Sequence, residues 1–170
     1  MDEWVEQVDE RDLVVAVVRR AEAVHRGWLH RIAVTMCRDR EGRFLVHRRS
    51  GRVSRFPGHY EVAVGGAVAV GESYEAAAAR ELEEELGVQV PVHPVVKFLS
   101  LGGLSPHWLA IHEAVVLGQV RPDGDEVVWH DWMTGSELSG FMRRQVFTPD
   151  SHEVLSRYVA ADRPVPSEEW

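Results

Sequence analysis

The chain consists largely of short apolar stretches in which β-branched and polar residues alternate, with turn-forming residues between them. This period of two is typical of β-strands that place one face on a core. Between two such stretches, Arg40-Glu41-Gly42 is a turn signal that predicts a hairpin. Strands are expected at residues 4–8, 13–18, 32–38, 44–47, 60–64, 95–101, 108–117 and 126–132.

One segment, residues 73–86, has the features of a helix. Ser73 is a plausible N-cap, alanines fill the first turns, and Gly87 is the expected stop. The apolar stripe expected to face the core is Ala79, Leu82 and Leu86. Shorter helices are expected at residues 19–25 and 136–143, and a last helix starts at Thr148-Pro149-Asp150. Many strands with two main helices predict an α/β fold with a mixed sheet between helices.

Length and composition indicate a single domain over residues 1–170, with an N-terminal hairpin extension over about 1–30 and a loose tail over about 163–170. No apolar run reaches about 18 residues, so no membrane association is expected. The net charge of −8 argues against a nucleic-acid partner. The single cysteine, Cys37, is expected to be buried on a strand, and the acidic N-terminus has no signal-peptide pattern. We therefore expect a cytoplasmic protein.

Four glutamates fall within five consecutive residues of the 73–86 helix. At about 100° per residue, Glu81, Glu84 and Glu85 share about one third of the helix circumference, whereas Glu83 points elsewhere and is expected to be solvated. Carboxylates this close repel one another, and a bound divalent cation is the most economical reason for their clustering. Hard oxygen ligands on a rigid element suit Mg²⁺ or Mn²⁺ rather than zinc.

Residues 66–88 read GAVAVGESYEAAAARELEEELGV. They match every fixed position of the Nudix box, which is glycine, any five, Glu, any seven, then Arg-Glu-apolar-any-Glu-Glu-any-Gly-apolar. The chain from about residue 4 to 158 resembles a Nudix hydrolase. It is similar in particular to the isopentenyl-diphosphate-isomerase-like branch of that superfamily, through features such as His47-Arg48-Arg49 and Phe56-Pro57-Gly58.

The resemblance implies a Nudix-type α/β/α sandwich that hydrolyses a pyrophosphate bond in a nucleoside diphosphate-type small molecule, using Mg²⁺ or Mn²⁺. It implies that the metal is held by the carboxylates of Glu81, Glu84 and Glu85 and by the Gly66 carbonyl. It also implies that Arg80 orients these glutamates, with Glu72 as a structural acid and candidate partner of Arg80. The predicted catalytic residues are Glu81, Glu84, Glu85 and Arg80.

Hydrolysis by water needs a carboxylate that accepts a proton. Glu81 is one candidate for this general base. In other members of the family the base comes from a different loop, so Glu113, Asp123, Asp125 and Glu126 also stay open.

Arginines cluster just before the box, and a planar guanidinium suits phosphate oxygens. The cluster is Arg48, Arg49, Arg52 and Arg55, and one or two of its members are expected to clamp substrate phosphates, with Arg48, Arg49 and Arg55 as the predicted substrate-binding residues. Specificity is expected in the loops around the site, at residues 51–59, 102–107 and 120–125.

Two other functions stay open beside hydrolysis. An isopentenyl-diphosphate-type isomerase would need a protonating cysteine, and its position is occupied by Gly65 here, with Ala67 at a nearby histidine position. A non-catalytic nucleotide-binding sensor could keep the same fold. For assembly the expectation is a homodimer, since dimers are common among soluble enzymes.

Overall fold

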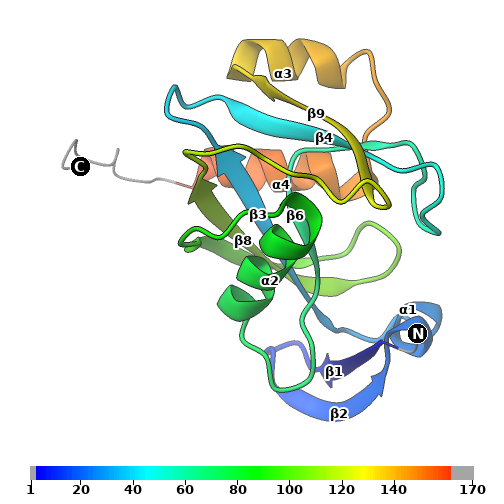
Figure 1. Cartoon of the computed structure of the whole chain (residues 1–170). Coiled ribbons are helices and arrows are strands. Elements are labelled where there is room, and N and C mark those ends of the chain that lie inside the picture. The colour runs from blue at the N-terminus through cyan, green and yellow to red at the C-terminus, as the bar shows by residue number, and fades with distance from the viewer. Residues whose placement is uncertain (1–2, 162–170) are drawn as a thin grey trace.

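The computed structural model describes residues 3–161. Nine strands and four helices follow one another along this part of the chain (Figure 1). The strands are β1 (Trp4–Val8), β2 (Val14–Arg19), β3 (Arg31–Arg38), β4 (Phe44–Arg49), β5 (Tyr60–Glu61), β6 (Val64–Ala67), β7 (His93–Ser100), β8 (His107–Val115) and β9 (Val127–Met133). The helices are α1 (Arg20–Arg26), α2 (Tyr74–Leu86), α3 (Gly135–Met142) and α4 (Pro149–Ala160).

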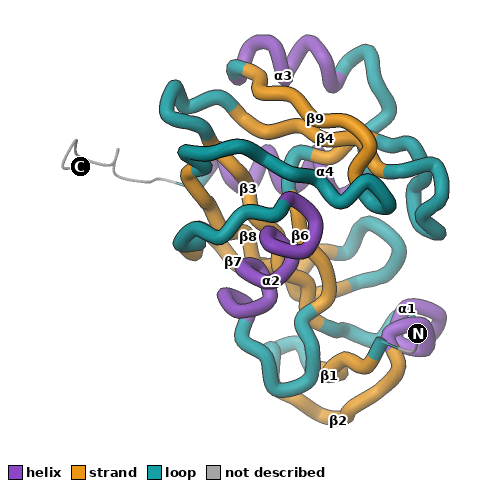
Figure 2. The backbone as a smooth tube through the Cα atoms, viewed as in Figure 1, coloured by secondary structure: helices purple, strands orange, loops and turns teal. Residues whose placement is uncertain are grey.

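Seven of the strands form one mixed sheet, which Figure 2 shows at the centre of the molecule. The order is β5-β4-β3-β8-β7, with β6 paired to β3 and β9 paired to β4. Strands β3 and β8 run parallel, and the other pairs in this sheet are antiparallel. The predicted α/β fold with a mixed sheet is confirmed.

Helices cover both faces of the sheet, because alternate residues of its central strands feed two separate cores. On β3, Ala33 and Cys37 pack in the core that α2 contributes to. Met36 packs on the opposite face, with Val154 and Tyr158 of α4. Figure 1 shows α2 and α4 on opposite sides of β3. Cys37 is 1% exposed, as expected for a buried strand residue.

Helix α2 begins and ends where the sequence predicts. The Ser73 hydroxyl accepts a hydrogen bond from the Ala76 backbone N–H, and Gly87 ends the helix in the left-handed region at φ 63°. The predicted apolar stripe is wrong in one member, because Ala79 is exposed. Ala78 takes its place, since it lies one turn before Leu82 on the same face.

Two strand predictions need correction. The hairpin expected between residues 32–38 and 44–47 has one pair in register, Arg38 with Phe44, after which β4 leaves β3 and pairs with β9. The strand expected at 60–64 is two strands: β5 pairs with β4, and β6 pairs with β3. The chain therefore crosses from β4 to β3 at Val62-Ala63, and the strand after the crossing, β6, lies next to the acidic helix α2.

The N-terminal residues form the expected antiparallel hairpin of β1 and β2, followed by α1. A small core of Val5, Ala23 and Ala67 attaches this extension to β6. The tail expected at about 163–170 lies outside the described residues. Of the helices between residues 3 and 161, none combines the length and the apolar character needed to cross a membrane.

Candidate active site

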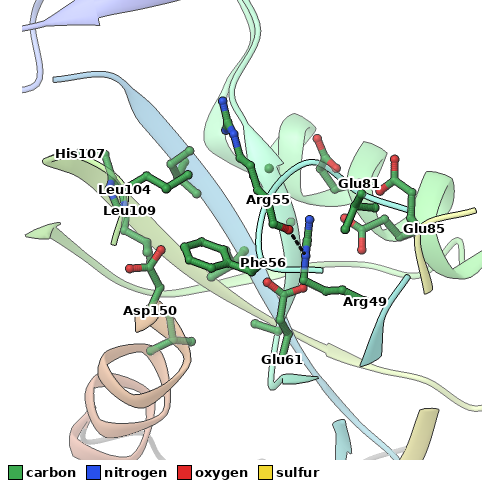
Figure 3. A pocket seen from close by; sticks show the side chains of 18 of the residues that line it. Arg49, Arg55, Phe56, Glu61, Glu81, Glu85, Leu104, His107, Leu109 and Asp150 are labelled. Atoms are coloured by element: carbon green, nitrogen blue, oxygen red, sulfur yellow. Dashed lines mark hydrogen bonds and ion pairs between the residues drawn. The ribbon is translucent and has the colours of Figure 1, made fainter. Parts of the chain in front are cut away.

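A cavity of about 660 Å³ lies between α2, the 50–59 loop, β6 and the N-terminal end of α4. Its size is typical of a pocket for a small molecule. Figure 3 shows Glu81 and Glu85 at one end and His107 and Asp150 at the other, with Arg55 and Phe56 between them. The cavity therefore has two polar ends. One is the acidic wall, formed by Glu81, Glu84 and Glu85 of α2, and the other is the group that contains His107 and Asp150.

Arg80 connects the acidic wall to the chain that leads into α2. Its guanidinium donates two hydrogen bonds to Glu72 and one to the Ala67 carbonyl oxygen. Nη1 also reaches Glu81 at 2.7 Å and Glu84 at 3.3 Å. Hydrogen bonding to Glu72, followed by the contact with Glu81, raises the pKa of Arg80 despite partial burial. The predicted partnership of Arg80 and Glu72 is present in the structure.

Glu81 lies directly against the strand that carries Gly66. A Cβ atom on Gly66 would be 2.5 Å from Oε1 of Glu81, so a residue with a side chain would displace the carboxylate. Burial raises the pKa of Glu81, Arg80 opposes this, and Glu84 and Glu126 add to it. Gly66 thus lets the α2 carboxylate and the β6 backbone meet at one point of the cavity.

Glu85 is the buried member of the acidic wall, with 6% of its surface exposed. Burial raises its pKa well above the ordinary value, and the neighbouring carboxylates of Glu61, Glu81 and Glu126 raise it further. Glu84 is more open, with a side chain 61% exposed. Glu83 is also exposed and bonds to Gln89, which is consistent with the predicted solvated position.

Sequence reasoning missed Glu61, which lies on the two-residue strand β5 and lines the same cavity. Its Oε2 accepts hydrogen bonds from His47 Nε2 at 3.1 Å and Arg49 Nη1 at 3.0 Å. Burial acts to raise the pKa of Glu61, but these two partners outweigh it and the pKa is lowered. No sequence motif around Glu61 predicts its role, because it reaches the cavity only through the pairing of β5 with β4.

The five candidate general bases occupy different places. Glu81 and Glu126 line the cavity. Glu113 is bonded to the Tyr158 hydroxyl. Asp123 accepts from the Asp125 backbone N–H within its own loop, and Asp125 lies 3.8 Å from Arg52. Glu113, Asp123 and Asp125 are not brought to the cavity.

Of the arginines predicted to bind substrate, Arg49 and Arg55 line the cavity and Arg48 does not. Arg48 donates to the Gly58 carbonyl oxygen and lies over the Tyr60 ring, because adjacent residues on β4 point to opposite faces. Arg20, which was not predicted, also lines the cavity. Burial lowers the pKa of Arg55, and the charges of Arg20 and Arg49 lower it further. These like charges make the centre of the cavity suitable for an anion.

Among the described residues, no three Asp, Glu, His or Cys side chains already form a ready set of metal ligands. In this arrangement the Arg80 guanidinium lies between Glu81 and Glu84 and serves as their counter-charge. The chemistry of the acidic wall nevertheless fits a hard divalent cation. Its donors are carboxylate oxygens, and the buried Glu85 is surrounded by like charges that a cation would offset.

The position expected for an isomerase cysteine has no room for one. A Cβ atom on Gly65 would lie 2.1 Å from the Ala33 carbonyl oxygen and 2.7 Å from the Val34 Cα. Because β6 packs this closely on β3, a side chain at residue 65 would force the two strands apart. The structure therefore gives no support to proton transfer from this position.

The sheet lies between helices, and the acidic helix α2 runs along one wall of the cavity. Residues 28–158 match the model of the NUDIX domain, and the chain belongs to the Nudix family. It is similar to an uncharacterized Nudix hydrolase from Streptomyces coelicolor, at 42% identity over 92% of this chain and 88% of the relative. A Nudix hydrolase from Deinococcus radiodurans is 31% identical over 81% of this chain and 82% of the relative.

Solved structures agree with this assignment. A crystal structure of a Deinococcus radiodurans protein has a TM-score of 0.79 at 27% identity, covering 92% of this chain and 99% of that chain. A MutT protein from Methanosarcina mazei has a TM-score of 0.60 at 21% identity, covering 76% and 91%, and supports the fold alone. Nudix hydrolases cleave pyrophosphate bonds in small molecules and generally use divalent metals.

Proposed function

We propose that this chain hydrolyses the pyrophosphate bond of a nucleoside diphosphate-type substrate with the help of Mg²⁺ or Mn²⁺. The observation that supports this most directly is the placement of Glu81, Glu84 and Glu85 beside a cavity whose centre is lined by arginines. Acidic residues for a cation and basic residues for phosphate lie next to each other there. A homodimer and a cytoplasmic location stay predictions.

Glu81, Glu84 and Glu85, with the Gly66 carbonyl, would hold the metal at the end of the cavity formed by α2. When bound, the metal neutralises phosphate charge and lowers the pKa of the attacking water. Arg80, fixed by Glu72, orients Glu81 and supplies a positive charge near it. Arg49 and Arg55 would hold the phosphate oxygens, because a guanidinium donates to them in a planar fork.

The proton of the attacking water would go to Glu126 or Glu81, the two candidate bases that line the cavity. Although burial raises the pKa of Glu81, its Oε1 is already taken by a 2.7 Å hydrogen bond from Arg80, and its other oxygen would be the one left for the metal. Glu126 belongs to the exposed end of the loop before β9. We therefore assign the general base to Glu126 and the main role of Glu81 to holding the metal.

The proposal is tested by incubating the purified chain with nucleoside di- and triphosphates, nucleotide sugars, dinucleotides and prenyl diphosphates. Phosphate release is followed with and without a coupling phosphatase. We expect turnover of at least one nucleoside diphosphate-type compound with Mg²⁺ or Mn²⁺, and loss of turnover in EDTA. Activity that survives full chelation would exclude the metal role, and inertness towards every compound would favour a non-catalytic sensor.

A further inference from the structure

A second group of polar side chains lies at the end of the cavity away from α2. His30 precedes β3, His107 begins β8, and Asp150 is in the first turn of α4. All three line the cavity. Figure 3 shows His107 and Asp150 near each other, across Arg55 and Phe56 from the glutamates of α2. Neither metal binding nor the hydrolytic step uses this group.

His107 presents an unpaired nitrogen in a buried place. The residue is 4% exposed, and its Nδ1 lies 2.8 Å from the Ser105 carbonyl oxygen. Because a carbonyl only accepts, Nδ1 must carry the hydrogen, and in the neutral ring Nε2 is then a lone-pair acceptor. Nε2 is buried and has no hydrogen-bond partner among residues 3–161.

His30 also uses its Nδ1 to bond to a backbone carbonyl oxygen. It is 2% exposed, and its Nδ1 donates to the Trp28 carbonyl oxygen at 3.3 Å. Burial lowers the pKa of His30 to about 4, so the ring is neutral at pH 7 and Nε2 is an acceptor. The two imidazole centroids are 6.1 Å apart. Burial raises the pKa of Asp150, but a carboxyl oxygen can accept a hydrogen bond in either protonation state, so this end of the cavity offers three acceptors from three separate segments.

Apolar side chains frame these acceptors. Leu104 and Leu109 line the same end of the cavity, and Phe56 lies between it and the acidic wall. Phe56 has φ 48°, which a bulky residue rarely adopts. Such strain persists only where the surroundings hold it, and it is common at ligand sites. An aromatic face beside a set of acceptors suits a flat, hydrogen-bonding ring.

We propose that the pocket formed by His30, His107, Asp150 and Phe56 binds the base of the substrate and selects bases with an exocyclic amino group. This inference rests on the proposed function, since it assigns the part of the substrate attached to the pyrophosphate. An amino group donates two hydrogen bonds and matches acceptors. The oxo group of the corresponding base would face the same lone pairs, and its single neighbouring ring N–H could pair with only one of the three acceptors, leaving the others unsatisfied.

Other substituents match this pocket less well. An apolar prenyl chain would fill the space beside Leu104 and Leu109 but leave both imidazole nitrogens unpaired. A sugar hydroxyl both donates and accepts, so a pocket for sugar alone would not distinguish amino from oxo bases. The amino-to-oxo comparison therefore separates base recognition from these alternatives.

The test is equilibrium binding of nucleoside monophosphates to the full chain in EDTA, measured by calorimetry. The two matched pairs are adenosine with inosine monophosphate, and cytidine with uridine monophosphate. We expect the amino member to bind at least about 10-fold more tightly in one pair or both, the effect of about one well-placed hydrogen bond. His107→Gln should reduce the ratio to within about 3-fold, because its amide can donate or accept.

His93→Gln is the matched control, since His93 is exposed on β7 and does not line the cavity. It should keep the wild-type ratio, and His30→Gln provides a second pocket variant if His107→Gln does not fold. Equal affinities within both pairs, tighter binding of the oxo members, or no binding of any monophosphate would overturn the inference. A wild-type preference in a chain that hydrolyses nothing would leave the inference standing and overturn the proposed function instead.

Discussion

Arg80 and Glu72 form a two-point ion pair, with Nε 2.9 Å from Oε1 and Nη2 3.0 Å from Oε2. Oε2 of Glu72 also accepts from the Ala69 backbone N–H at 2.9 Å. This paired geometry fixes both the position and the plane of the guanidinium. It leaves Nη1 free to donate to Glu81. Because Glu72 precedes Arg80 by 8 residues, the ion pair also ties the turn before α2 to the helix itself.

Glu72→Gln should therefore destabilise the fold as well as the site. The substitution keeps the size of the side chain but replaces a charged acceptor of three hydrogen bonds, so we expect a loss of about 1–3 kcal/mol in unfolding free energy. Urea unfolding measures it. Glu10→Gln, at an exposed turn, is the control and should change stability by less than about 0.5 kcal/mol. Equal effects of the two substitutions would contradict a structural role for the pair.

Replacing the glutamates of α2 one at a time should separate metal ligands from solvated residues. Glu84→Gln and Glu85→Gln each remove a charged oxygen while keeping size, and each should lower kcat by roughly 10² or more. Glu83→Gln is the matched control and should stay within a few-fold of wild type, since Glu83 is exposed and bonds to Gln89. Steady-state hydrolysis of the best substrate gives the comparison. Sensitivity of Glu83 equal to that of Glu85 would show that the assignment of helix faces is wrong.

The assignment of the general base predicts a contrast between two neighbours in the loop before β9. Glu126→Gln should lower kcat by roughly 10² or more with little change in metal affinity, because it removes a proton acceptor. Asp125→Asn should have little effect, since Asp125 is exposed and does not line the cavity. If both variants retained wild-type kcat, the base would be Glu81.

Burial of His30 predicts sensitivity to mild acid. Its folded-state pKa is lowered from 6.5 to about 4, mainly by burial, so between these values the unfolded chain binds a proton that the folded chain does not. Stability should therefore fall as pH drops from 6.5 towards 4, by at most roughly 1.4 kcal/mol per pH unit from this group. Urea unfolding at pH 7 and pH 5 should show a smaller loss for His30→Gln. The control His25→Gln, at an exposed position on α1, should lose as much unfolding free energy between pH 7 and pH 5 as wild type does.

The acidic helix could be predicted from the sequence because its signals are local. Ser73 and Gly87 cap α2, and the spacing of the glutamates fixes which of them share a face. The one misplaced residue, Ala79, comes from a run of alanines, in which no side chain distinguishes the buried face from the exposed one. Large apolar residues such as Leu82 and Leu86 do make that distinction.

The rest of the cavity is set by pairings between distant segments. Glu61 comes near enough to Glu85 to raise its pKa because β5 pairs with β4, and the His30 and His107 rings are 6.1 Å apart because β3 and β8 run parallel. No short-range spacing in the sequence encodes either approach. The arginine cluster is an intermediate case: strand alternation shows that Arg48 and Arg49 point to opposite faces, but only the fold shows which one faces the cavity.

The most direct measurement of the central claim is thermal unfolding of wild type and of the double variant Glu84→Gln, Glu85→Gln, each with EDTA and with Mn²⁺. A ligand that binds only the folded chain, at 100-fold excess over its Kd, adds about 2.7 kcal/mol to the free energy of unfolding. For a domain of this size, that raises the melting temperature by roughly 5–10 °C. We expect that rise in wild type. The double variant should melt higher than wild type in EDTA, because carboxylate repulsion is relieved, and should lose most of the Mn²⁺ response. Equal Mn²⁺ shifts in the two proteins would show that the metal binds elsewhere and would contradict the account.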